Sequence, residues 1–138
     1  MYKPIRNTIL LLMVAAIFVP IPGEAAPPAD KQPLVLVIYA DWCPLCQRLK
    51  PTLALINEKY RGRIHFIRFD LTSEETTTQS EELASKLGLE KFFEQHKEVT
   101  ALVVIQDASG REVFRAEHDY DPLHYEAVLD RQLQVAHR

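Results

Sequence analysis

The sequence predicts a single α/β domain, and three features point to that fold class. The run Leu34 to Tyr39 is continuously apolar, as in a strand buried on both faces of a parallel sheet. The next apolar side chains recur at helical spacing, at Leu49, Leu53, Ile56 and Tyr60. Along the rest of the chain the patterns follow the order strand, helix, strand, helix, hairpin, helix, which is typical of helices packed on a largely parallel sheet.

The first helix is expected to run from Cys46 to Tyr60 and to contain Pro51. Because proline removes a backbone hydrogen bond and crowds the preceding turn, we expect a kink at Pro51 rather than two short helices. A second strand, Ile64 to Phe69, follows and is closed by Asp70. It should lie parallel to the first strand, since a helix separates the two.

The second helix is expected to begin at a capping box, Thr72 to Glu75, and to end at Gly88, a natural C-cap. A further segment, Glu90 to Glu98, adds another turn or two. Its adjacent aromatic residues, Phe92 and Phe93, are predicted to be core rather than a binding site, because large apolar side chains are usually buried.

The last elements are a hairpin and a helix. Strands at Ala101 to Ile105 and Glu112 to Ala116 flank a turn at Asp107 to Gly110. Asp121-Pro122 begins the final helix, because proline suits the first helical position. The core-facing residues of this helix are predicted to be Leu123, Ala127, Val128, Leu129 and Leu133.

The N-terminal residues have the features of a secretory signal. Lys3 and Arg6 give a basic start, Ile9 to Val19 is uncharged and apolar, and Gly23-Glu24-Ala25 supplies small residues before a cleavage after Ala25. An uncleaved membrane anchor is the alternative, although the apolar run is shorter than the roughly 20 residues that a spanning helix needs. The expected organisation is a signal peptide at 1–25, a proline-rich linker at 26–33 and a folded domain at 34–138.

Composition narrows the function classes. The formal net charge is −3 and the basic residues form no cluster, so nucleic acid is not an expected partner. The chain holds two cysteines, Cys43 and Cys46. An exported protein with one C-x-x-C pair has no structural disulfide framework, so these sulfurs are expected to serve exchange.

The position of the cysteine pair suits thiol–disulfide exchange. Cys43 and Cys46 lie where the first strand gives way to a helix, so one thiol can attack a partner disulfide and the other can resolve the mixed disulfide. Unpaired amides at the helix N-terminus favour a thiolate, most of all at Cys43. Pro44 suits the first helical position, and Trp42 is expected to cover the pair on one side.

A metal site is the alternative interpretation, because the same spacing builds half of many zinc sites. A structural zinc needs four ligands, and the sequence contains no second C-x-x-C or H-x-x-x-H pair. We therefore expect no resident metal. The alternative function is a copper- or zinc-handling or partner-binding module, in which Cys43 and Cys46 are soft-metal ligands and His118 or His96 is a further candidate ligand.

The stretch Tyr-Ala-Asp-Trp-Cys-Pro-Leu-Cys at 39–46, followed by Pro51, resembles the thioredoxin family, especially its membrane-associated or periplasmic reductases. The resemblance implies a minimal thioredoxin fold, with a four-stranded mixed sheet in the order 2-1-3-4 and helices on both faces. It also implies a monomeric thiol:disulfide oxidoreductase without a cofactor, exchanging with protein thiols or disulfides and supplied by a membrane or periplasmic redox donor. We expect the protein to reduce partner disulfides rather than to oxidise partner thiols. We expect it to act in the periplasm or outside the cell.

The resemblance also assigns a surface for the protein substrate, made of Trp42, Pro44, Leu45, Val99, Thr100 and Ala101. Most thioredoxins have a proline after a cis peptide bond at the position of Thr100. Because a cis bond without proline costs about 2.5 to 4 kcal/mol, a trans bond is expected here.

Two further positions depart from the family pattern. Val37 occupies the place of a buried carboxylate thought to assist proton transfer from the second thiol. His118 occupies the place of a glycine that faces the active site. A histidine there would stabilise a thiolate at Cys43 or act as a metal ligand; the alternative is an exposed loop histidine.

Overall fold

The computed structural model describes residues 32–136. The predicted signal peptide and all but the last two residues of the linker lie outside the described residues. Four strands form one sheet: β1 (Leu34–Tyr39), β2 (His65–Asp70), β3 (Leu102–Gln106) and β4 (Glu112–Glu117). Their order is β2-β1-β3-β4, with β1 parallel to β2 and antiparallel to β3, and β3 antiparallel to β4. The predicted α/β class and strand order are confirmed.

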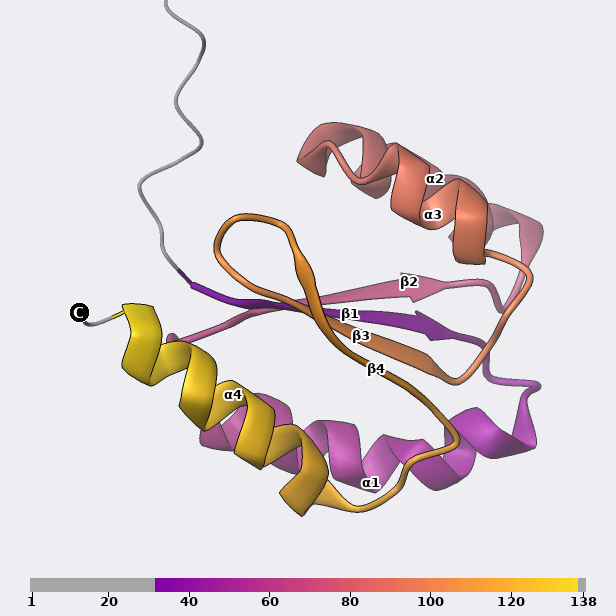
Figure 1. Cartoon of the computed structure of the whole chain (residues 1–138). Helices are drawn as coiled ribbons and strands as arrows, with labels where there is room; N and C mark the ends of the chain where they lie inside the picture. The colour runs from indigo at the N-terminus through magenta and orange to yellow at the C-terminus, as the bar shows by residue number, and fades with distance from the viewer. Residues whose placement is uncertain (1–31, 137–138) are drawn as a thin grey trace, which may run out of the picture.

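Helices cover both faces of the sheet, as predicted. Figure 1 shows α1 (Pro44–Lys59) and α4 (Pro122–Ala136) below the sheet, and α2 (Glu74–Leu87) and α3 (Glu90–His96) above it. Among residues 32–136, none of these helices combines the length and the apolar character needed to cross a membrane.

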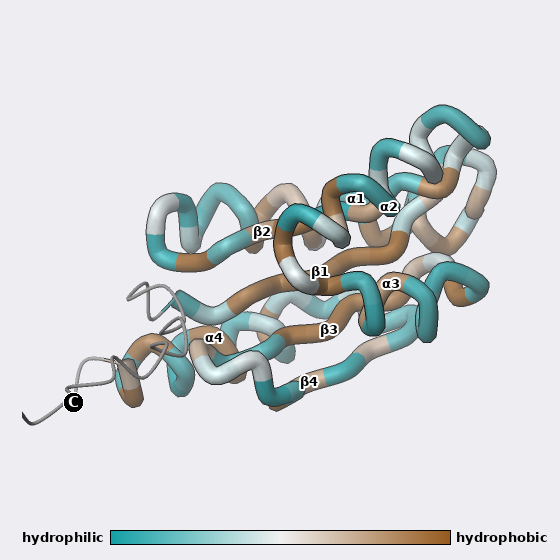
Figure 2. The backbone as a smooth tube through the Cα atoms, turned by 90° about the horizontal axis from the view of Figure 1, so that it is seen from above, coloured by the Kyte–Doolittle hydropathy of each residue, from teal (hydrophilic) through white to brown (hydrophobic). Residues whose placement is uncertain are grey.

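The continuous apolar run of β1 arises because both of its faces are buried. Side chains alternate across a strand, so Val35 and Val37 pack with α1 and α4 while Leu36 and Ile38 pack with α2 and α3. Figure 2 shows the central strands β1 and β3 in brown for most of their length, whereas β4 carries more teal. The molecule therefore has two apolar cores, one on each side of the sheet.

The first helix is a single helix with Pro51 inside it, so the alternative of two short helices is wrong. Pro44 is the first helical residue and Cys43 is the N-cap. The prediction that Pro44 takes the first helical position is confirmed. The apolar spacing alone, which begins at Cys46, misses this first turn, because its residues are a proline and a capping cysteine rather than core side chains.

The capping box of α2 lies one residue later than predicted. The Ser73 hydroxyl accepts from the Thr76 amide at 3.2 Å, and the Thr76 hydroxyl accepts from the Ser73 amide at 2.9 Å. The Thr72 hydroxyl instead donates to the Asp70 carboxylate and accepts from the Asp41 amide. Thr72 is therefore engaged by the segment that precedes the cysteines. The predicted C-cap is confirmed, since Gly88 has the left-handed φ of 69°.

Two other details differ from the predictions. Ala101, expected to begin β3, precedes the strand with a left-handed φ of 60°. On α4, Leu129 is buried and Val128 and Leu133 pack against the core, as predicted. Leu123, which is 64 % exposed, and the exposed Ala127 do not face the core as predicted. Tyr125, which was not predicted to face the core, is buried, and its hydroxyl donates to the Asp119 carbonyl at 2.7 Å.

The helix after Gly88 forms as expected and buries both of its phenylalanines. The Phe93 side chain is 1 % exposed and its ring lies edge-on to Phe69, with centroids 5.3 Å apart. Phe92 also contacts Phe69. The prediction that this aromatic pair belongs to the core is confirmed.

Candidate functional site

The two cysteines lie at the carboxyl end of β1, at the point where the chain turns into α1. Both are free thiols and both are buried, with Cys43 4 % and Cys46 1 % exposed. The Cys43 sulfur caps the helix by accepting from the Cys46 backbone amide at 3.4 Å. The first turn of α1 therefore brings both sulfurs to one place, as the C-x-x-C spacing predicts.

The loop between α3 and β3 faces the cysteines and contributes a side chain to the site. The Thr100 hydroxyl donates to the Cys43 sulfur at 3.2 Å. The next residue, Ala101, is buried and its amide donates to the Ile38 carbonyl of β1 at 3.0 Å. Residues 32–136 contain no cis peptide bond, which confirms the trans bond expected at Thr100.

The two thiols differ in acidity. Burial acts to raise the pKa of Cys43, but hydrogen bonds from the Thr100 hydroxyl, the Cys46 amide and thiol, and the Leu45 amide outweigh burial and hold this pKa below its ordinary value. Burial, and to a lesser extent the neighbouring Cys43 sulfur, raises the pKa of Cys46 to about 11. Near neutral pH, Cys43 is thus the thiol that ionises more readily and Cys46 stays protonated.

This difference predicts the order of alkylation. Below pH 9.0, the ordinary thiol value, iodoacetamide is expected to modify Cys43 well before Cys46, because only the thiolate reacts. The Cys43 rate should rise with pH and level off above its lowered pKa, while the Cys46 rate should keep rising towards about pH 11. Peptide mass spectrometry after timed quenching measures both rates. In denaturant the rates should converge; equal rates in the folded protein would contradict the assignment.

Apolar side chains lie exposed beside the buried sulfurs. The Trp42 side chain is 63 % exposed, and its indole N–H donates to the Leu71 carbonyl at 3.3 Å. Val99 and Pro44 are exposed and Leu45 is half-buried. The residues that the sequence assigned to the substrate surface thus come from the segments that flank the cysteines.

A polar network next to Trp42 was not predicted from the sequence. The Tyr39 hydroxyl donates to the Asp41 carboxylate, the Gln47 side chain donates to the Asp41 carbonyl at 2.8 Å, and the Asp41 amide donates to Thr72. The hydrogen bond from Tyr39 is the main cause of a lowered pKa for Asp41. Asp41 lies within the 39–46 motif, but nothing in the spacing indicates that Thr72 would reach it.

The structure does not link either candidate histidine to the cysteines. His118 is exposed, has a left-handed φ of 60°, and makes no hydrogen bond or ion pair with Cys43 or Cys46. His96 stacks on Phe92 and uses both ring nitrogens, with the Phe92 carbonyl at 2.7 Å and the Arg115 guanidinium at 2.9 Å. Within residues 32–136, no three His, Cys, Asp or Glu side chains gather as a metal-ligand group.

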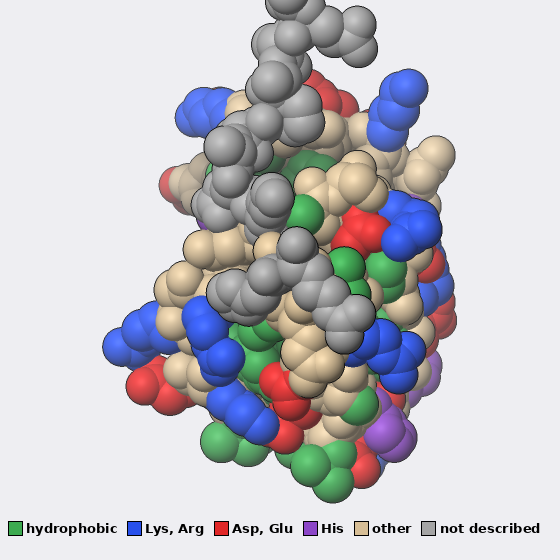
Figure 3. All heavy atoms as spheres, turned by 60° about the vertical axis from the view of Figure 1, so that its left-hand side comes forward, with side chains coloured by type: hydrophobic (Ala, Val, Ile, Leu, Met, Phe, Trp, Pro, Cys, Tyr) green, Lys and Arg blue, Asp and Glu red, His purple; other side chains and the backbone are tan. Residues whose placement is uncertain are grey.

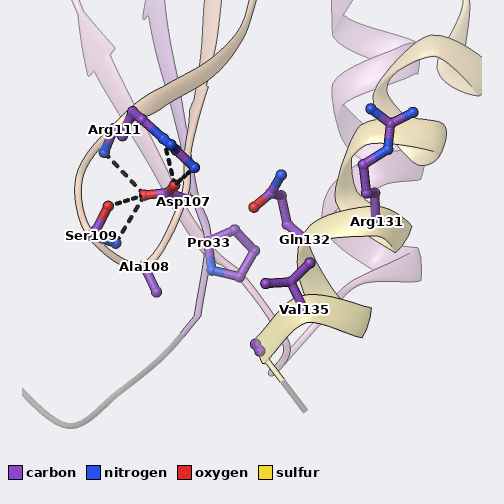
Figure 4. Close-up of a pocket in the computed structure, with 9 residues that line it drawn as sticks. Pro33, Asp107, Ala108, Ser109, Arg111, Arg131, Gln132 and Val135 are labelled. Carbon is purple, nitrogen blue, oxygen red and sulfur yellow. Dashed lines mark hydrogen bonds and ion pairs between the residues drawn. The ribbon is translucent and has the colours of Figure 1, made fainter. Parts of the chain in front are cut away.

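A hollow of about 300 Å³ lies at the opposite end of the sheet from the cysteines. It is lined by Pro33, the β3–β4 turn and the last turns of α4 (Figure 4). The Asp107 carboxylate at its edge accepts from Ser109 and Arg111. Because the hollow lies at the far end of the sheet, it takes no part in the cysteine site.

On the face of the molecule in Figure 3, acidic and basic side chains are interspersed.

Comparisons with known proteins agree with the geometry. The sequence profile described as Thioredoxin matches residues 26–107. "Thioredoxin-like protein HCF164, chloroplastic" of Oryza sativa subsp. japonica is 29 % identical over 62 residues, which cover 45 % of this chain and 22 % of that protein. "Thiol:disulfide interchange protein TxlA" of Synechococcus elongatus is 30 % identical over 46 residues, which cover 33 % and 24 %. The chain thus spans about a quarter or less of these relatives.

A solved structure supports the fold. The solution structure of a thioredoxin-like protein in the oxidized form superposes with a TM-score of 0.52 at 13 % identity, covering 76 % of this chain and 80 % of that chain. At this identity the likeness concerns the arrangement of strands and helices.

Proposed function

The chain belongs to the thioredoxin family, and from this premise we propose that it is a thiol:disulfide oxidoreductase acting through Cys43 and Cys46. The observation that carries the proposal is the asymmetry of the pair. One buried thiol at the N-terminus of α1 has a lowered pKa and its neighbour has a raised one. An attacking thiol and a resolving thiol need this difference, since the thiolate is the nucleophile.

The reaction runs in two exchange steps. The Cys43 thiolate attacks one sulfur of a partner disulfide, so that a mixed disulfide forms and the other partner sulfur leaves as a thiolate. Cys46 then loses its proton and attacks the Cys43 sulfur, which forms the Cys43–Cys46 disulfide and releases the second partner thiolate. Two electrons pass from the dithiol to the partner, and the protons end on the partner thiols. Because Val37 is apolar and buried, water or the departing thiolate accepts the Cys46 proton.

The partner's disulfide reaches Cys43 across the exposed residues around it. Trp42 and Val99 offer apolar contact area, and the Thr100-Ala101 turn lies beside the Cys43 sulfur. Pro44 and Leu45 complete this surface at the start of α1. A surface of this kind suits a loop of a protein substrate.

We further propose that the protein acts as an exported reductant. The basic start and apolar run of residues 1–25 support export to the periplasm or outside the cell, with the membrane-anchored form as the alternative. There a membrane or periplasmic redox donor would keep the cysteine pair reduced. The protein would act as a monomer, with the cysteine pair as its redox group and no cofactor.

Two measurements on the purified chain test the proposal. Reduced protein mixed with insulin should form the Cys43–Cys46 disulfide in step with the loss of insulin disulfides. Equilibration against glutathione or dithiothreitol buffers then gives the reduction potential. A reduction potential of about −270 mV would support the role of a reductant, and one of about −120 mV would identify an oxidant. The absence of any reversible couple would overturn the oxidoreductase assignment.

A further inference from the structure

We propose that the Thr100 hydroxyl is a catalytic hydrogen-bond donor that holds the Cys43 sulfur as the attacking thiolate and thereby favours the dithiol form of the pair. The inference rests on the proposed function and deepens it by assigning a role to a residue where the family usually has proline. Proline has neither a hydroxyl nor an amide hydrogen to offer a sulfur.

The Thr100 hydroxyl is hydrogen-bonded to the Cys43 sulfur. Thr100 lies 57 positions from Cys43 in the sequence, and its Oγ1 donates to the sulfur at 3.2 Å. The Thr100 side chain makes no other hydrogen bond among residues 32–136. The other donors to the Cys43 sulfur are the Leu45 and Cys46 amides and the Cys46 thiol, and all of them belong to α1. Thr100 is thus the donor that a different segment of the chain supplies.

The backbone around Thr100 holds the hydroxyl in place. Ala101 is fully buried, and its amide donates to the Ile38 carbonyl at the end of β1. Its φ of 60° is one that residues with a side chain adopt reluctantly. The surrounding contacts therefore impose this turn, and the turn directs Thr100 towards Cys43.

Hydrogen bonds to an ionised group are roughly twice as strong as those between neutral groups. The bond from Thr100 is thus strongest when Cys43 is a thiolate and weaker when this sulfur is part of a disulfide. It favours the dithiol over the disulfide, which makes the pair more oxidising than it would be without the hydroxyl. It also makes Cys43 a better leaving group when the mixed disulfide is attacked.

The first test compares Thr100→Val, which keeps the shape and removes the hydroxyl, with Thr100→Ser, which keeps the hydroxyl. Cys43 is titrated through the ultraviolet absorbance of its thiolate and through the pH profile of its alkylation. The acid dissociation constant of Cys43 should fall by about tenfold in Thr100→Val and stay near wild type in Thr100→Ser. If Thr100→Val does not fold, Thr100→Ala removes the same hydroxyl without adding a group.

The second test uses the pH dependence of the reduction potential, which a purely structural role would not alter. Within the described part of the chain, Cys46 is the titratable side chain hydrogen-bonded to the Cys43 sulfur. Its pKa of about 11 keeps Cys46 protonated at pH values well below 11. Wild type and Thr100→Val should have equal potentials at pH values where Cys43 is a thiol in both. Above both Cys43 pKa values, the variant should be lower by about 30 mV, which corresponds to a tenfold change in equilibrium constant.

An unchanged Cys43 titration in folded Thr100→Val would overturn the role of the hydroxyl, as would a Thr100→Ser variant that titrates like Thr100→Val. The titration needs no protein substrate. If the protein did not exchange disulfides with insulin, the proposed function would fail, but the Cys43 titration would still test the role of the Thr100 hydroxyl.

Discussion

Cys43→Ser is expected to abolish disulfide exchange, whereas Cys46→Ser should accumulate a covalent complex with the protein partner. Without Cys43 no thiolate of lowered pKa remains, and Cys46, buried and with a pKa of about 11, cannot replace it near neutral pH. Turnover with insulin should fall by about a thousandfold or more in both variants, because residues that act as one unit are each indispensable.

Non-reducing electrophoresis and peptide mass spectrometry distinguish the two variants. The Cys46→Ser variant should hold the partner through Cys43, since serine cannot displace the mixed disulfide. The double variant, with serine at both positions, controls for attachment that does not involve the site. Equal attachment through either cysteine would show that the roles of attacking and resolving thiol are assigned wrongly.

Phe93→Ala is expected to lower the free energy of unfolding by about 3 to 5 kcal/mol, the usual cost of removing a buried aromatic ring. Phe93 belongs to α3, and its ring packs edge-on against Phe69 in the core between the sheet and α2 and α3. Deleting the ring leaves a cavity beside Phe69, in the core cluster to which Leu36 and Ile38 of the central strand also belong. The substitution tests whether the segment between Gly88 and the Thr100 loop is an integral part of the fold.

Urea unfolding followed by circular dichroism measures this effect as a shift of the midpoint at unchanged slope. Leu87→Ala is the matched control, because Leu87 is 47 % exposed at the end of α2 and should change stability by no more than about 0.5 kcal/mol. If both variants lost the same stability, the packing of α3 would contribute little to the fold.

The central strand, the start of α1 at the cysteine pair and the end of α2 could be predicted from local physical rules. An apolar run that needs cover on both faces predicts a central strand, and β1 has the predicted bounds. Proline at the first helical position and two cysteines three residues apart predict a helix that begins at a dithiol, which α1 does. Gly88 ends α2 as expected because the left-handed conformation suits glycine. Each of these predictions depends on residues close together in the chain.

The remaining features depend on contacts between distant segments, and for this reason the sequence pattern missed them. Thr72 does not cap α2 because it is engaged by Asp41, 31 positions earlier. Ala101 leaves the strand because its buried turn is held against Ile38. The sequence alone showed that this chain has a dithiol at the start of a helix in an α/β fold. Only the packing of the α3–β3 loop against β1 decided which side chain donates to the Cys43 sulfur, because a hydrogen bond across 57 positions leaves no periodic signal.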